Sequence, residues 1–180
     1  MSNGLKIERT GRILHLDGDS RYAKKSFKYY REIGLNAIVK NIPEAIQPTV
    51  VKKLLSQYKP DILVITGHDV MFKKNKNYND IYNYKNSRHF INTVLMARQW
   101  EKENKHDITI IAGACESFFE AIMKSGADFA SSPARILIDY TDPLMVAGKI
   151  AKTDENKYIT IDEIAGELKD GINSIGGTRK

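Results

Sequence analysis

Short apolar stretches alternate along this chain with stretches in which apolar residues recur at helical spacing. Two of the short stretches, 61–66 and 107–112, show no polar alternation, which is typical of parallel strands buried on both faces. Five strands are predicted in this way, at 12–16, 36–41, 61–66, 107–112 and 127–130. Helices are predicted at 20–33, 50–55, 90–100, 118–125, 143–150 and 161–168, with a further short strand at 157–160.

The order of these elements predicts an α/β fold, a three-layer α/β/α sandwich around a mainly parallel sheet. We expect the strand order 2-1-3-4-5, as in flavodoxin-like and caspase-like folds. A chain of 180 residues with 42% hydrophobic residues is large enough for one packed core. The sequence therefore predicts a single domain at 1–175, followed by a disordered tail at 176–180.

Composition and charge argue against a membrane span, a signal peptide and a nucleic-acid partner. No apolar run approaches the roughly 18 residues of a membrane span, and the N-terminus lacks the apolar stretch of a signal peptide. The net charge is +6, but the lysines are spread along the chain, and the dense basic stretch at 72–78 is typical of a solvated loop. We therefore expect a cytoplasmic protein with no membrane span and no nucleic-acid partner.

The chain has one cysteine, Cys115. A single cysteine excludes an internal disulfide and a cysteine-rich zinc site, and it is typical of a reducing compartment. We expect no metal and no cofactor, so any chemistry of Cys115 is that of a thiol.

Three residues with candidate chemistry stand where predicted strands end: Asp17, His68 and Cys115. In an open parallel sheet the carboxyl ends of the strands share one rim, and neighbouring strands lie about 4.8 Å apart. A lone cysteine or histidine there is more often structural than reactive. The pair at the ends of adjacent strands instead favours a functional interpretation, and the long polar connection at 70–86 leaves the sheet beside His68.

The chemistry of these residue types suits a nucleophile and a base. We expect Cys115 at the start of the helix that follows it, where the helix dipole and a nearby imidazole favour the thiolate. Backbone N–H groups at Cys115 and just after His68 can hold an oxyanion. Asp17 is the candidate to orient the imidazole, although an acid at that place is also commonly a polar cap.

Spacing narrows the class of enzyme. Cys115 lies 47 residues after His68, close to the roughly 50 residues that separate His from Cys in caspase-type proteases. A glutamine amidotransferase needs a histidine after its nucleophile, and the four histidines, at 15, 68, 89 and 106, all precede Cys115.

The block Ala112-Gly113-Ala114-Cys115-Glu116-Ser117, with the apolar run before it, is similar to the nucleophile strand of the caspase and legumain superfamily. The histidine strand departs from that superfamily. Its members have Gly directly after the His, whereas here Gly67 precedes His68 and Asp69 follows it. This difference bears on the geometry of the expected oxyanion hole.

A resemblance to the YabG family of sporulation-specific proteases covers nearly the whole chain. The matching segments are 11–19, 60–69, 84–87, 112–117, 119–121 and 129–133. This resemblance implies a cysteine endopeptidase that processes spore coat and other sporulation proteins through a thioester acyl-enzyme, with cleavage after basic residues. It implies location in the cytoplasm of the sporulating cell, in association with the forming spore coat. Family members carry a further N-terminal region, so this chain resembles a trimmed or self-processed catalytic domain.

Recognition of a basic side chain needs a carboxylate in the substrate pocket. Asp19, Asp69 and Glu116 are the candidates by position, and each is also compatible with an ordinary surface acid.

Two other functions remain open. Asp17 and Asp19 resemble the acidic pair of a receiver-like signalling module, but such a module also needs an Asp at the end of strand three and a Lys at the end of strand five. Strand three here ends at Gly67-His68, and strand five leads into Ser131-Ser132-Pro133. The third possibility is a non-catalytic α/β domain that binds a partner.

Overall fold

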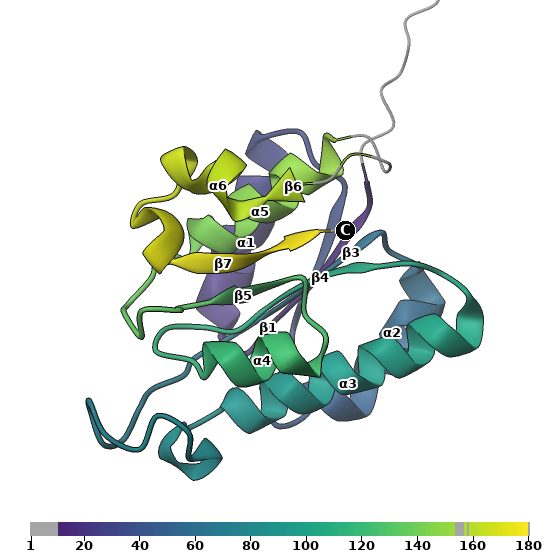
Figure 1. The fold of residues 1–180 in the computed structure, drawn as a ribbon. Coiled ribbons are helices and arrows are strands. Elements are labelled where there is room, and N and C mark those ends of the chain that lie inside the picture. The colour runs from purple at the N-terminus through teal and green to yellow at the C-terminus, as the bar shows by residue number, and fades with distance from the viewer. Residues whose placement is uncertain (1–10, 154–156, 158, 180) are drawn as a thin grey trace, which may run out of the picture.

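A seven-stranded sheet organises the fold (Figure 1). The computed structural model describes residues 11–153, 157 and 159–179. The strands of the described part are β1 (Ile13–Asp17), β2 (Ala37–Asn41), β3 (Ile62–Thr66), β4 (Thr109–Ala112), β5 (Phe129–Ser131), β6 (Ile159–Thr160) and β7 (Ile175–Arg179). Their order is β2-β1-β3-β4-β5-β7-β6, and β1 to β5 pair in parallel. The predicted order 2-1-3-4-5 and the α/β class are confirmed, and two antiparallel strands extend the sheet.

Helices cover both faces of the sheet, which makes three layers (Figure 1). The α-helices are α1 (Ser20–Glu32), α2 (Gln47–Tyr58), α3 (Ser87–Asn104), α4 (Phe119–Ser125), α5 (Thr141–Ala151) and α6 (Ile161–Ile164). Short 3-10 turns are η1 (Ile81–Asn83), η2 (Ala165–Glu167) and η3 (Gly171–Asn173). None of the helices in the described residues is long and apolar enough to cross a membrane.

The doubly buried strands divide their side chains between two cores. Leu63 and Ile65 of β3 pack in one core with α2, α3 and α4, whereas Ile62 and Val64 pack in the other with α1 and α5. Successive side chains of a strand point to opposite faces, so a run without polar residues fits a strand covered on both sides. This arrangement carries the C-terminal ends of β1, β3 and β4 to one rim.

The C-terminal strand corrects one prediction. The expected disorder at 176–180 is wrong for residues 176–179, because β7 pairs antiparallel with β5 in the register Phe129↔Gly177. Gly177 has φ +121°, and a Cβ added there would lie 2.1 Å from the Asp128 carbonyl oxygen. The glycine pair thus permits close packing of two strands. Residue 180 lies outside the described residues.

The connection between β3 and α3 is folded back on itself. Met71 and Tyr84 form an isolated antiparallel bridge, and η1 lies within the segment. The Asn83 side chain binds backbone groups of Lys73 and Lys76. The polar composition predicted a loop, and these local hydrogen bonds give that loop a defined shape.

Candidate active site

A cavity of about 410 Å³ opens at the C-terminal rim of the sheet. His68, after β3, and Cys115, after β4, both line it. Other lining residues come from β1, from α1 and from the segment that follows β5, which we call the 132–140 segment. The structure therefore brings the predicted imidazole and thiol into the walls of one cavity.

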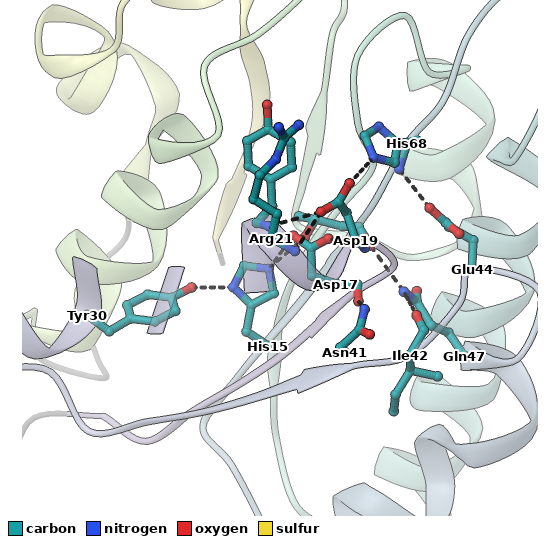
Figure 2. Close-up of polar contacts among 12 residues, drawn as sticks. His15, Asp17, Asp19, Arg21, Tyr30, Asn41, Ile42, Glu44, Gln47 and His68 are labelled. Atoms are coloured by element: carbon teal, nitrogen blue, oxygen red, sulfur yellow. Dashed lines mark hydrogen bonds and ion pairs between the residues drawn. The ribbon is translucent and has the colours of Figure 1, made fainter. Parts of the chain in front are cut away.

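His68 has three hydrogen-bond partners, and Figure 2 shows two of them, Asp19 and Glu44. Its Nε2 lies 2.6 Å from Asp19 Oδ2, its backbone N–H donates to Glu44 Oε1 at 2.8 Å, and its carbonyl accepts from Asn86 Nδ2 at 2.8 Å. The hydrogen bond with His68 is the main reason that the pKa of Asp19 lies below its ordinary value. Asp19 is therefore an ionised acceptor, so we assign the proton to Nε2, which leaves the Nδ1 lone pair as the base.

Asp17 does not take the position expected for it. Its carboxylate accepts hydrogen bonds from Thr66 Oγ1 at 2.9 Å and from the Asp19 backbone N–H at 2.8 Å. It is buried, and burial raises its pKa. The prediction that Asp17 orients the His68 ring is wrong: Asp19, two residues beyond β1 and the N-cap of α1, reaches that ring instead.

A second histidine lies beneath the rim (Figure 2). His15 is fully buried, with Nδ1 2.8 Å from the Tyr30 hydroxyl and Nε2 2.6 Å from Thr66 Oγ1. Thr66 donates its proton to Asp17, so it accepts from His15 Nε2–H, and Tyr30 donates to Nδ1. Burial lowers the pKa of His15 to about 3, which keeps the ring neutral.

Cys115 lies on a turn between β4 and α4. Its Sγ is 3.3 Å from the backbone nitrogen of Ile138, which donates to it, and 3.7 Å from the Ile138 carbonyl oxygen. The expectation that Cys115 starts the next helix is wrong, because α4 begins at Phe119. The turn needs Glu116 at φ +56°, a conformation that does not continue into a helix. Contact with the 132–140 segment, rather than a helix dipole, defines the surroundings of the thiol.

Asp69 ties the histidine turn to the cysteine turn. Its Oδ1 accepts from the backbone N–H groups of Val70 and Asn86, and its Oδ2 accepts from the hydroxyls of Ser87 and Ser117. The Ser117 hydroxyl in turn accepts from the backbone N–H of Ala114, next to the nucleophile candidate. Asp69 is buried, and burial raises its pKa. Its contacts indicate a positioning residue.

The three predicted pocket acids thus lie in different surroundings. Asp19 binds the imidazole, Asp69 lies inside the hydrogen-bond network, and Glu116 forms an ion pair with Lys74 of the 70–86 connection. The carboxylates among the residues that line the cavity are Asp17 and Asp139. Asp139 belongs to the 132–140 segment, which begins within the Ser131-Ser132-Pro133 motif.

Sequence reasoning also missed Glu44. Besides accepting from the His68 backbone, the Glu44 carboxylate packs against two glycines: a Cβ at Gly18 or Gly67 would lie 2.2 or 2.4 Å from it. Glu44 lies in the connection between the predicted strand at 36–41 and the predicted helix at 50–55, where the residue pattern indicates no function. The glycines beside His68 and Asp17 were the available signal, since they mark a close approach.

Among the described residues, no group of three or more His, Cys, Asp and Glu side chains is placed to hold a metal ion. The Asp17 and Asp19 carboxylates are bound to Thr66 and His68 instead.

Comparisons with known proteins fit the resemblance noted above. The family described as YabG peptidase U57 matches residues 2–180. The chain is 38% identical over 167 residues to the protein named sporulation-specific protease YabG of Bacillus subtilis (strain 168). That alignment covers 93% of this chain and 57% of the relative, so the chain spans less than two thirds of the relative's length.

Solved structures with a similar backbone fold include two receiver domains. One belongs to the Francisella response regulator 1452, with TM-score 0.49, 14% identity and coverage of 79% of this chain and 97% of that one. The other belongs to the histidine kinase CKI1 from Arabidopsis thaliana, complexed with Mg²⁺, with TM-score 0.46, 15% identity and coverage of 76% and 90%.

Proposed function

Because the chain belongs to the YabG peptidase U57 family, we propose that it is a cysteine endopeptidase with Cys115 as the nucleophile and His68 as its base. The observation that carries the proposal is that Cys115 and His68 line the same cavity. Asp19 supports the role of His68, because an ionised carboxylate on Nε2 orients the ring and stabilises its protonated form.

The reaction follows from these positions. His68 Nδ1 takes the proton of the Cys115 thiol, and the thiolate attacks the carbonyl carbon of the scissile peptide bond. The C–N bond then breaks, the imidazolium gives its proton to the leaving amine, and a thioester remains on Cys115. Water, deprotonated by the same imidazole, hydrolyses the thioester and restores the free thiol.

Two features support this sequence of steps. In the structure the imidazole is hydrogen-bonded to Asp19 and the thiol accepts from the Ile138 backbone N–H, and the His68 side chain is 55% exposed. The proposed reaction requires the exposed ring to turn toward the thiol when substrate binds. Among the described residues, no hydrogen bond occupies the backbone N–H of Cys115 or of Asp69. Those two donors are the proposed oxyanion hole.

The proposed substrates are spore coat and other sporulation proteins, cleaved after basic residues, in the cytoplasm of the sporulating cell and at the forming spore coat. The name of the Bacillus subtilis relative supports the sporulation setting. The carboxylates in and beside the cavity support a basic side chain at the cleavage site.

A peptide-library digest tests the proposal. We expect the chain to cleave peptides after Arg or Lys, and Cys115→Ala and His68→Ala each to abolish cleavage while the circular dichroism spectrum stays that of the parent. His89→Ala is the matched control, since His89 lies on α3 and outside the cavity lining. Cleavage at the parent rate in either dyad variant would refute the dyad.

A further inference from the structure

One wall of the cavity already holds a cation. The Lys25 ammonium lies 5.4 Å from the centroid of the Tyr22 ring and 5.7 Å from that of Tyr140. The two rings lie 5.7 Å apart, and all three residues line the cavity. A cation over an aromatic face is attracted by the negative face of the ring. This pair of rings is therefore a place where positive charge is stabilised.

A fixed negative charge stands next to the rings. Asp139 precedes Tyr140 and lines the same cavity. Its Oδ1 accepts hydrogen bonds from the Thr141 backbone N–H at 3.0 Å and from the Thr141 hydroxyl at 2.6 Å, and these bonds lower its pKa. Its Oδ2 lies 3.5 Å from Lys169 Nζ, but the Lys169 side chain is 71% exposed, so solvent weakens the ion pair. Asp139 thus stays ionised and is available to a further cation.

The other acids of the rim are less suited to bind a ligand cation. Both oxygens of Asp17 accept internal hydrogen bonds, and its burial raises its pKa. Asp19 is bound to the imidazole of His68.

The aromatic pair also lies beside both groups of the proposed dyad. The Tyr22 ring contacts the His68 ring edge-on, with centroids 6.1 Å apart. On the other side, Ile138, which precedes Asp139, contacts the Cys115 thiol. A substrate side chain next to the scissile carbonyl would enter the space between these contacts.

We propose that Tyr22, Tyr140 and Asp139 form the subsite for a basic substrate side chain, and that Lys25 occupies this subsite as an internal competitor which the substrate displaces. The inference rests on the proposed function for the identity of the ligand. Beyond the proposed function, the inference assigns the residues that recognise the cation, and it assigns Lys25 as a residue whose replacement strengthens binding.

The test is the binding of agmatine, a small guanidinium amine, to the chain by isothermal titration calorimetry. We expect Asp139→Asn to raise the Kd roughly 5- to 10-fold, because a charge-assisted contact is lost. We expect Lys25→Met to lower the Kd about 3-fold, because an ammonium over the rings no longer competes. Lys24→Met and Asp107→Asn are the matched controls, an exposed lysine and an exposed acid outside the cavity lining, and we expect the parent Kd.

Opposite effects of the two variants are the signature of the subsite. An unchanged or raised Kd in Lys25→Met, an unchanged Kd in Asp139→Asn, or no agmatine binding by parent and Lys25→Met would each overturn it. Binding does not require the thiol, so agmatine results with these signs stand even if no peptide is cleaved. Conversely, cleavage by the dyad without these shifts would leave the proposed function standing and refute the subsite.

Discussion

Two histidines lie at or beneath the C-terminal rim of the sheet, each with an aspartate close by, and their surroundings differ. His15 lies within β1, fully buried, with both ring nitrogens hydrogen-bonded to Tyr30 and Thr66. His68 lies just beyond β3, its side chain 55% exposed, with one nitrogen bound to Asp19. Only the second has a ring nitrogen available to a substrate or a thiol.

The pKa of His15 shows the same contrast. Burial lowers the pKa of His15 to about 3, so the ring stays neutral. A general base must accept a proton, and His15 is therefore unsuited to that role. Its near neighbour Asp17, 3.8 Å away, is itself buried and has a raised pKa. The comparison teaches that position relative to the strand end decides the role of a His–Asp pair. Within a strand the pair is buried and structural. Two residues beyond the strand end, the His side chain is accessible to solvent and to a substrate.

Replacing each histidine by glutamine is the strongest way to break the comparison. We expect His68→Gln to lower kcat/KM by roughly 10²- to 10⁴-fold, the usual contribution of a general base, whereas His15→Gln changes it by less than about 5-fold. Steady-state cleavage of an Arg peptide measures both. Comparable losses in the two variants would mean that His15 takes part in the chemistry.

The two aspartates give the next largest difference. Asp19→Asn keeps a side chain that caps α1 but removes the charge beside His68, so we expect kcat to fall roughly 10- to 100-fold. That is less than the loss of about 10⁴ known for a buried triad acid, because His68 is exposed.

Asp17→Asn should act on stability instead. Its amide would place donors against the Thr66 hydroxyl or the Asp19 N–H, at a cost of about 1–3 kcal/mol in unfolding free energy. Urea unfolding and kcat, measured on both variants, separate the two roles. The distinction fails if Asp17→Asn lowers kcat as much as Asp19→Asn does.

Sequence patterns predicted the parts of the fold that depend on burial. The runs without polar alternation became β3 and β4, and their alternation with helices predicted the parallel order. Because strand ends converge in such a sheet, His68 and Cys115 were expected to be neighbours. These predictions depend on regular backbone geometry, which local residue patterns determine.

The parts that were missed depend on contacts between distant segments. Nothing near residue 19 in the chain indicates that Asp19, rather than Asp17, meets a histidine 49 positions away. The Cys115 turn needs the 132–140 segment, and β7 needs the edge of β5, so neither follows from local periodicity. A glycine pair near the C-terminus looks flexible until its partner strand is known.

The smallest predicted effect concerns the pH dependence of stability. His15 has an ordinary pKa of 6.5 when unfolded and about 3 when folded, so between these values the unfolded chain binds a proton that the folded chain does not. Unfolding free energy must therefore fall as pH drops below about 6.5, by about 1.4 kcal/mol per pH unit from this residue. His89, with a lowered pKa, adds a contribution of the same sign.

Urea unfolding between pH 7 and pH 5 measures this slope. Asp17 and Asp69, whose pKa values are raised by burial, contribute with the opposite sign, and the parent and the His15 variant share them. We expect His15→Gln to lose most of the slope. Tyr30→Phe removes the hydrogen bond to His15 Nδ1, but we expect this variant to keep the slope, because burial rather than that bond lowers the pKa of His15. A slope that stays at the parent value in His15→Gln would mean that His15 is not the main group that titrates on unfolding, and His15 would then no longer serve as the neutral, structural counterpart of His68.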